Sequence, residues 1–498
     1  MQFQLAHFFE LWRKRQWAFG QEFCTGSTQN RMFAEIEQEF RRYYMKFTAP
    51  VTKNQTLQAT IQDLTYEGLG VAKVDHYPLF VENALPGEAV TLQVTKIGKN
   101  FGYARVTDWQ SKSPDRVELP NQAYRQTGIA PLGHLAYPAQ LKFKQHQIEM
   151  QFERNQLAVP VKATLGMADP TGYRNKAQVP VREIKGELET GFYRKRSHQV
   201  MPLTDFYIQD PEIDKAIVKV RDLLRQYHVV PYDEKRHQGV IRNIMVRRGY
   251  YSHELMVILI TRVADFPQKD ALVAAIVSAL PETVSVIQSV NAKQTNVILG
   301  PTTKKLFGKS FLRDQLLGLT FDISAQSFYQ VNPQQTEKLY QAAIEAAGLT
   351  GTETVIDAYC GIGTISLALA QHAKYVYGIE VVPAAVADAK RNAKLNDIRN
   401  TKFSLGQAER VMQEWAKDGQ QPDVLVVDPP RKGLAPEFIA AVGEMKPKRM
   451  VYVSCNPATL ARDLAALQAL GYHAASTQPV DMFPQTTSIE SVTGLSLA

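Results

Sequence analysis

Residues 354–364 read Thr-Val-Ile-Asp-Ala-Tyr-Cys-Gly-Ile-Gly-Thr, and this stretch decides the fold of the C-terminal part of the chain. Its β-branched start is typical of a buried strand, and the apolar residues after Thr364 are typical of a helix. Gly361 and Gly363 lie between the two and let the backbone turn tightly. A strand that leads through a glycine loop into a helix is the first half of a βαβ unit, from which parallel sheets are built.

The same alternation of strand and helix continues along the rest of the sequence. Short β-branched runs occur at 375–380, 424–428 and 450–454, and helical stretches such as 383–395 lie between them. We therefore predict a doubly wound α/β domain with a Rossmann-like sheet over residues 321–498. The ligand of such a domain binds at the carboxyl ends of the strands.

The glycine loop predicts a nucleoside ligand. Glu380 ends the second strand about twenty residues after the loop, where a carboxylate can accept both ribose hydroxyls. The loop lacks the third glycine of the dinucleotide fingerprint and any Gly-Lys-Ser/Thr phosphate cradle, which argues against NAD and ATP. S-adenosylmethionine, which has no phosphate, fits better. The alternative is a tight turn between strand and helix without a ligand.

Two more strands end in residues that can carry chemistry. Asp428-Pro-Pro-Arg431 places a carboxylate and a guanidinium at the same sheet edge, unless it is a plain proline-rich loop. Cys455 directly follows another strand that is expected to be buried, at 450–454. Asn456 and Pro457 then predict the start of a helix that stops near Gly471. The helix N-terminus should lower the pKa of the thiol, whereas a buried, inert cysteine is the alternative.

A thiolate at this sheet edge suits the methylation of uracil. Carbon 5 of uracil is a poor nucleophile, but addition of a thiolate at carbon 6 produces an enolate whose carbon 5 can attack a sulfonium methyl group. A base must then remove the proton from carbon 5. Glu490, in the run Thr487–Val492, is the candidate base, and the alternative is a surface carboxylate.

Composition places the chain among multidomain proteins with an anionic partner. Its 498 residues are too many for one ordinary core. Lys and Arg number 57 against 49 Asp and Glu, which favours nucleic acid over membrane. Cys24, Cys360 and Cys455 are too few for a disulfide framework, and no apolar run reaches the roughly 20 residues of a membrane span. We expect a cytoplasmic monomer that binds RNA and no membrane.

Three segments precede the α/β domain. Residues 1–46 are rich in aromatic residues and arginine, and form either an RNA-binding arm or an extension upstream of a start at Met45. Residues 47–109 alternate like a small β-barrel whose basic and aromatic residues suit RNA contact or an ordinary strand edge. Residues 110–320 predict an α+β central domain with a basic sheet face for RNA. The basic residues are Arg174, Lys176, Arg194, Lys195, Arg196, Arg247 and Arg248.

Five ordered motifs resemble those of the RNA uracil-5-methyltransferase family, in the form that carries an N-terminal TRAM domain. The motifs are Ser327–Pro333, Asp357–Thr364, Asp428–Lys432, Val453–Pro457 and Ile489–Val492, and the segments that resemble the TRAM signature are Asp63–Lys73 and Leu85–Glu88. The resemblance covers residues 47–498. It implies a class I methyltransferase fold preceded by an OB-like TRAM barrel and a central RNA-binding domain.

The resemblance also implies roles for individual residues. Gln330, Tyr359, Glu380 and Asp428 would contact S-adenosylmethionine. Cys455 would be the nucleophile and Glu490 the base, which leaves Cys360 as a loop residue without a chemical role.

The sequence departs from the family pattern at the cysteines of an iron-sulfur cluster, and this indicates which branch of the family it resembles. Many members hold an iron-sulfur cluster on three closely spaced cysteines and a later fourth one. Asn121, Thr127 and Ala130 stand at the first three places here, and the fourth falls near Phe206. Without thiolates no iron-sulfur cluster can form, and no other metal is expected. The chain therefore resembles the cluster-free ribosomal RNA enzymes of Gram-positive bacteria, with a central domain held by ordinary packing.

The expected reaction is methyl transfer to carbon 5 of a uridine in 23S ribosomal RNA, since the tRNA branch of the family typically lacks the TRAM barrel. A tRNA uridine methyltransferase is the second interpretation. A non-catalytic RNA-binding or assembly factor is the third, and it would not need Cys455 or Glu490.

Overall fold

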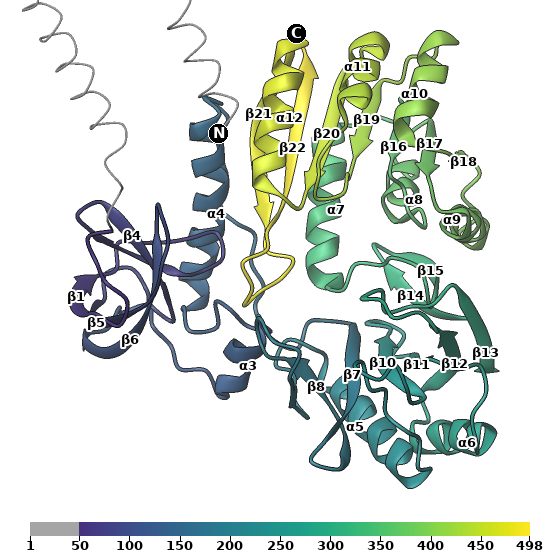
Figure 1. The fold of residues 1–498 in the computed structure, drawn as a ribbon. Helices are drawn as coiled ribbons and strands as arrows, with labels where there is room; N and C mark the ends of the chain where they lie inside the picture. The colour runs from purple at the N-terminus through teal and green to yellow at the C-terminus, as the bar shows by residue number, and fades with distance from the viewer. Residues whose placement is uncertain (1–48) are drawn as a thin grey trace, which may run out of the picture. The chain divides into compact units, whose positions relative to one another are not determined.

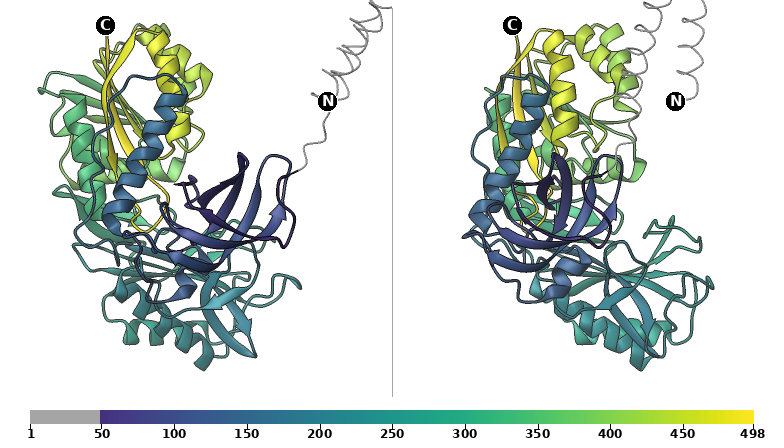
Figure 2. Two further views of the ribbon diagram at one scale, coloured as in Figure 1. Left: turned by 90° about the vertical axis from the view of Figure 1, so that its left-hand side faces the viewer. Right: turned by 60° about the vertical axis from the view of Figure 1, so that its left-hand side comes forward.

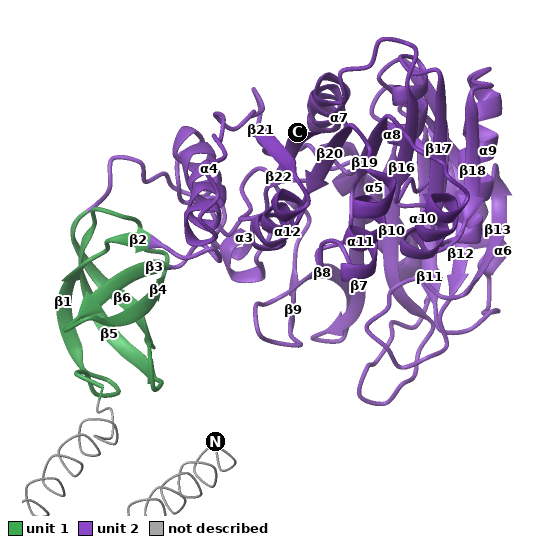
Figure 3. Ribbon diagram, turned by 90° about the horizontal axis from the view of Figure 1, so that it is seen from above, with its two compact units in different colours: residues 1–63, 70–111 green, residues 64–69, 112–498 purple. Residues whose placement is uncertain are grey.

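The computed structural model describes residues 49–498, so the expectations for residues 1–46 lie outside the described part of the chain. The described residues divide into two compact units (Figure 3). Residues 49–63 and 70–111 make up the first unit, and residues 64–69 and 112–498 make up the second.

A six-stranded sheet makes up most of the first unit, as the alternation of its sequence predicts. The sheet order is β1-β5-β6-β4-β3-β2, and its strands are strongly curved (Figure 2). Val90, Leu92 and Val94 of one strand are fully buried, because alternate residues of a strand face the same side. The strands are β1 (Thr56–Thr60), β2 (Asp63–Leu64), β3 (Gly70–Val74), β4 (Tyr77–Glu82), β5 (Ala89–Ile97) and β6 (Gly102–Ser111).

From residue 112 onward, the second unit contains helices and a seven-stranded sheet, which is the α+β class expected before the C-terminal sheet. The seven strands have the order β13-β12-β11-β10-β7-β8-β9, and apolar residues of α5 and α6 share one core with them. The strands are β7 (Lys176–Ile184), β8 (Glu187–Tyr193), β9 (Val200–Pro202), β10 (Ile241–Arg248), β11 (Leu255–Thr261), β12 (Thr283–Val290) and β13 (Thr302–Gly308). The helices are α3 (Gln122–Thr127), α4 (Tyr137–Arg154), α5 (Pro211–Gln226) and α6 (Lys269–Ala279).

The four positions that the family resemblance compares with cluster cysteines hold ordinary packing contacts. Asn121 caps α3 by accepting a hydrogen bond from the Ala123 amide at 2.9 Å, and the Thr127 hydroxyl donates to the Ala123 carbonyl at 2.7 Å. Ala130 and Phe206 are fully buried in the central core. Within residues 49–498, no group of three or more histidines, cysteines or acids is arranged to hold a metal ion.

A second seven-stranded sheet carries the C-terminal half, with the order β18-β17-β16-β19-β20-β22-β21. The first five strands in this order are parallel, and β22 runs antiparallel to β20 (Figure 1). This is the predicted doubly wound sheet. The strands are β16 (Thr354–Ala358), β17 (Tyr375–Glu380), β18 (Thr401–Leu405), β19 (Val424–Val427), β20 (Arg449–Ser454), β21 (Tyr472–Val480) and β22 (Glu490–Leu497), and the hairpin β14 (Phe311–Leu316) and β15 (Leu319–Ser324) precedes them.

Helices cover both faces of this sheet. Apolar residues of α7, α8 and α9 share a core with one face, and those of α4, α10, α11 and α12 share a core with the other. Since strand side chains alternate between faces, Val424 and Val426 of β19 belong to the first core and Leu425 and Val427 to the second. The helices are α7 (Pro333–Ala347), α8 (Thr364–Ala370), α9 (Pro383–Leu395), α10 (Ala408–Lys417), α11 (Pro436–Met445) and α12 (Pro457–Ala469).

Candidate active site

The glycine loop joins β16 to α8 at the carboxyl edge of the sheet, as predicted. Gly361 and Gly363 have φ values of 55° and 87°, the left-handed region that favours glycine. The carboxylate of Glu380 lies against this loop. It accepts hydrogen bonds from the Gly361 amide at 3.0 Å and from the Val382 amide at 2.8 Å. The second strand therefore delivers its terminal acid to the loop that leaves the first.

Asp357, in β16, is a buried acid whose individual role the sequence did not predict. It is fully buried, its Oδ2 accepts a hydrogen bond from the Ser366 hydroxyl, and its Oδ1 has no partner among the described residues. Burial raises the pKa of Asp357 to about 7, with a smaller contribution from the charge of Glu380 and with the Ser366 hydrogen bond opposing it. The sequence signal that could have indicated a role for Asp357 is its position near the end of the strand that precedes the glycine loop.

Asp428 follows β19 and extends this group of acids. Its pKa is raised by burial and by the negative charge of Asp357. Pairing of β16 with β19 places the two strands side by side, which explains why these carboxylates interact. The strand ends thus concentrate acids at one edge of the sheet, where a cationic or hydroxyl-rich ligand is favoured.

Cys455 and Glu490 lie near the acids at this edge of the sheet. Glu490 is 6% exposed, so the alternative of a surface carboxylate is wrong. Its pKa is raised well above the usual value by burial and by Asp428, while Arg431 opposes the shift. Cys455 interacts electrostatically with Glu490, Asp428 and Arg431. The structure therefore brings the candidate nucleophile and the candidate base together.

The predicted helix after Cys455 is present, but its effect on the thiol is not the expected one. The side chain of Asn456 accepts a hydrogen bond from the Ala458 amide at 3.1 Å and caps α12. The pKa of Cys455 is nevertheless raised to about 11, because burial and the negative charges of Glu490 and Asp428 outweigh Arg431 and the backbone. The expectation of a lowered pKa is wrong for the protein without ligands.

Tyr340, on α7, is a neighbour of the acids that sequence reasoning missed. Its hydroxyl lies 2.9 Å from the Thr364 hydroxyl. Its pKa is raised mainly by burial, and further by Asp428, Asp357 and Glu490. The only sequence signal for Tyr340 is that its helix begins at the end of the motif Ser327–Pro333.

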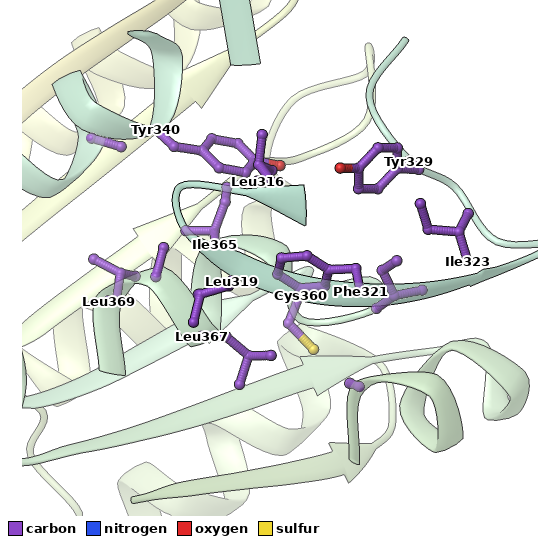
Figure 4. Close-up of a cluster of buried hydrophobic side chains, with 14 of the residues drawn as sticks. Leu316, Leu319, Phe321, Ile323, Tyr329, Tyr340, Cys360, Ile365, Leu367 and Leu369 are labelled. Carbon is purple, nitrogen blue, oxygen red and sulfur yellow. The ribbon is translucent and has the colours of Figure 1, made fainter. Parts of the chain in front are cut away.

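Cys360 and the remaining predicted residues lie around this group. Cys360 is 5% exposed in an apolar cluster, and burial raises its pKa strongly, which leaves it without a reactive thiolate (Figure 4). Tyr359 packs against Phe438 of α11, with ring centroids 5.8 Å apart. Gln330 is buried on the loop before α7, and its carbonyl accepts a hydrogen bond from the Asn175 side chain at 3.3 Å.

The loop between β21 and β22, which ends at Glu490, is fixed by contacts from far along the chain. The buried ammonium of Lys144 on α4 donates to Asp481 and, at 3.0 Å, to the Phe483 carbonyl. Gln140 and Gln485 exchange two hydrogen bonds of 3.0 Å. These contacts hold the candidate base in place, and sequence reasoning predicted none of them.

This sheet, its glycine loop and the acid that ends β17 define a class I S-adenosylmethionine-dependent methyltransferase. Residues 294–497 match the model of a family described as tRNA (uracil-5-)-methyltransferase, and residues 50–107 match the TRAM domain. The chain belongs to the RNA (uracil-5-)-methyltransferase family, and the resemblance stated from its motifs is confirmed. No helix among residues 49–498 is both long enough and apolar enough to cross a membrane.

Known proteins are similar over most of the chain. An uncharacterized RNA methyltransferase of Lactiplantibacillus plantarum is 62% identical over 91% of this chain and 99% of its own, and one of Enterococcus faecalis is 56% identical over 90% and 99%. The crystal structure of Pyrococcus abyssi tRNA (uracil-54, C5)-methyltransferase with S-adenosyl-L-homocysteine has a TM-score of 0.71 and 25% identity. It covers 88% of this chain and 99% of its own.

Proposed function

We propose that this RNA methyltransferase modifies carbon 5 of a uridine in 23S ribosomal RNA through a transient covalent bond between Cys455 and carbon 6. The observation that supports the covalent route is the proximity of a thiol and a buried carboxyl group at the edge that carries the glycine loop. The charges of Glu490 and Asp428 both act on the Cys455 thiol. A non-catalytic RNA-binding protein would have no use for this arrangement.

The residues around the glycine loop fit S-adenosylmethionine. Asp357 carries a buried oxygen without a hydrogen-bond partner in the described part of the chain, and a hydroxyl or amino donor would satisfy it. Glu380 and Asp428 add carboxylates, which suit ribose hydroxyls and a cation. In this proposal Gln330 and Tyr359 complete the contacts. When bound, S-adenosylmethionine supplies an electrophilic methyl group on a positively charged sulfur.

Cys455 and Glu490 perform the two bond-changing steps that the protein itself supplies. The Cys455 thiol loses its proton to water, and its sulfur bonds to carbon 6 while the electrons of the carbon 5–carbon 6 double bond move to the carbonyl oxygen at carbon 4. Carbon 5 then accepts the methyl group. Glu490 removes the remaining proton from carbon 5, the double bond forms again, and the carbon–sulfur bond breaks. Arg431 acts throughout as the cation that favours the charged forms of Cys455 and Glu490.

The second candidate is methylation of a tRNA uridine. The TRAM match favours ribosomal RNA, since the tRNA branch of the family typically lacks this barrel. However, the Pyrococcus abyssi protein, a tRNA (uracil-54, C5)-methyltransferase, is similar over 88% of this chain. Mass spectrometric mapping of 5-methyluridine in both RNA classes from a deletion strain separates the two: loss from 23S RNA is expected, and loss from tRNA alone would replace our proposal.

The covalent route is tested with RNA that contains 5-fluorouridine. Its carbon 5 carries fluorine, which Glu490 cannot remove as a proton, so the adduct persists after methyl transfer. With S-adenosylmethionine present, we expect a band of slower mobility on a denaturing gel. Cys455→Ala should abolish it, and Cys360→Ala is the matched control that should retain it. An adduct that persists in Cys455→Ala would overturn the assignment.

A further inference from the structure

Three of the basic residues of the central domain lie on one face of its sheet. Lys176 of β7 is directly opposite Arg247 of β10 in the antiparallel register, and such pairs share a face. Arg174, in an isolated bridge with Gln209, precedes Lys176 by two positions, and both arginines act electrostatically on the Lys176 ammonium. These three residues are called the cation cluster below.

Other basic residues of the same segment do not share this environment. Arg248 is the next residue after Arg247 and therefore lies on the opposite face, where it forms a 2.8 Å ion pair with Asp210. Arg194, Lys195 and Arg196 lie in the turn after β8, and all three are exposed. The predicted single basic face is therefore wrong in part, because neighbouring residues of a strand point to opposite sides.

The cation cluster has no neutralising acid. Among the described residues, none of its three side chains takes part in an ion pair with a carboxylate, although buried cations in proteins are usually paired. Arg247 is 5% exposed, donates to the Ser327 carbonyl at 2.6 Å, and has an Nε without a partner in residues 49–498. Burial and the two arginines lower the pKa of Lys176 to about 7. A site that gathers one buried and two half-buried cations without an acid is complementary to an anion.

The cluster adjoins the loop that leads into the candidate active site. The Arg247 guanidinium holds the Ser327 carbonyl, and the Asn175 amide, between Arg174 and Lys176 in sequence, donates to the Val331 carbonyl at 2.8 Å. Residues 327–331 include Gln330 and lead into α7, whose Tyr340 interacts electrostatically with the acids of the site. An anion at the cluster is thus adjacent to the segment that borders the reaction.

We propose that Arg174, Lys176 and Arg247 bind a backbone phosphate of the RNA substrate beside the nucleotide to be methylated. The inference rests on the proposed function, since it requires a uridine in the site. A phosphodiester supplies the missing negative charge, and its oxygens can accept from the free Nε of Arg247 and from the Lys176 ammonium. Such a contact fixes the position of the RNA without reading its sequence.

The salt dependence of RNA binding tests this site. We would measure the binding of unmodified 23S RNA and tRNA transcripts to the full chain carrying Cys455→Ala, over a series of salt concentrations. Because each phosphate contact releases counterions, Lys176→Met should reduce the slope of log affinity against log salt by about one and weaken binding about tenfold. Lys176→Arg should restore both. Lys219→Met, which removes an exposed lysine of α5, should change neither.

A second variant and a measurement of cofactor binding complete the test. Arg174→Gln provides an independent test should Lys176→Met fail to fold, as judged by thermal unfolding, and it should give the same reduced slope. Unchanged slopes in both variants overturn the proposal. The proposal is also overturned if the variants bind S-adenosylmethionine more weakly while the salt slope of RNA binding stays unchanged. The cation cluster would then bind the carboxylate of the cofactor. If the slopes fall but no 5-methyluridine forms with intact Cys455, the proposed function fails and this phosphate site stands.

Discussion

Cys455 directly follows β20, and Glu490 is the first residue of the antiparallel strand β22. The register of β20 and β22 pairs Ser454 with Ser491, and one further step along each strand reaches the cysteine and the glutamate. Directly opposed residues of an antiparallel pair lie about 5 Å apart and share a face. The geometry of a sheet edge, rather than a flexible loop, therefore sets the relation between the proposed nucleophile and base.

Replacement of Glu490 should separate methyl transfer from product release. In Glu490→Gln, carbon 5 keeps its proton after methylation, so ordinary uridine RNA should remain bound to Cys455 and turnover should fall by about 10²- to 10⁴-fold. The accumulated adduct is measured on a denaturing gel during single turnover. Glu437→Gln, an exposed glutamate of α11, is the control. Loss of turnover without adduct would show that Glu490 acts before methyl transfer.

The reactivity of Cys455 should depend steeply on pH. A thiol with a pKa of about 11 is almost entirely protonated at neutral pH, and its thiolate fraction rises about tenfold for each pH unit. Alkylation by iodoacetamide, followed on the Cys455 peptide by mass spectrometry, should rise from pH 7 and level off near pH 11. Arg431→Met should slow alkylation at pH 8, because Arg431 lowers the pKa of this thiol. A plateau near pH 8 would contradict the raised pKa.

Asp357 should make the protein less stable as pH rises. Its folded-state pKa of about 7 exceeds the unfolded value of 3.8, so the folded state binds more protons between these values and loses stability as pH increases through them. Between pH 5 and pH 8 the loss is about 2 to 3 kcal/mol. Asp357→Asn should remove this loss when urea unfolding is measured at both pH values. Exposed Asp397→Asn should retain it, and an equal loss in Asp357→Asn would refute the argument.

The ion pair of Lys144 and Asp481 should be costly to break from one side. Both side chains are fully buried, so Lys144→Met leaves a carboxylate without its cation and should destabilise the protein by about 3 to 5 kcal/mol. Lys144→Met combined with Asp481→Asn removes the uncompensated charge and should recover much of this loss. Urea midpoints of the three variants measure the coupling. Additive effects would mean that the pair does not act as a unit.

Local patterns predicted the strand ends well, because a strand, a glycine loop and a capped helix are specified by adjacent residues. The helix predicted at 383–395 is α9 with the same bounds, and Asp428 and Cys455 do end neighbouring strands. Glu490 could be singled out only through the family resemblance, because its place depends on the insertion of β22 beside β20. The Lys144–Asp481 pair joins residues 337 positions apart, and no local pattern encodes such a contact.

Contacts between residues far apart in the sequence also explain why pKa shifts could not be predicted from local patterns. In the sequence Lys176 looks like an ordinary polar position of a strand, yet burial and two nearby arginines lower the pKa of its ammonium. The helix N-terminus after Cys455 was a sound local argument for a lowered pKa. Burial of the thiol reverses this expectation, and two carboxyl groups from the ends of β19 and β22 add to the rise in pKa.

The position of β22 inside the sheet has a consequence for how this enzyme is made. Since β22 lies between β20 and β21, a nascent chain that has emerged from the ribosome as far as residue 480 still lacks an inner strand. Cys455 is then already synthesised, but its partner carboxyl group is not, and the edge of β20 remains unpaired. Stalled or truncated translation products therefore carry the thiol without the proposed base, and their unpaired strand edge favours aggregation and proteolysis.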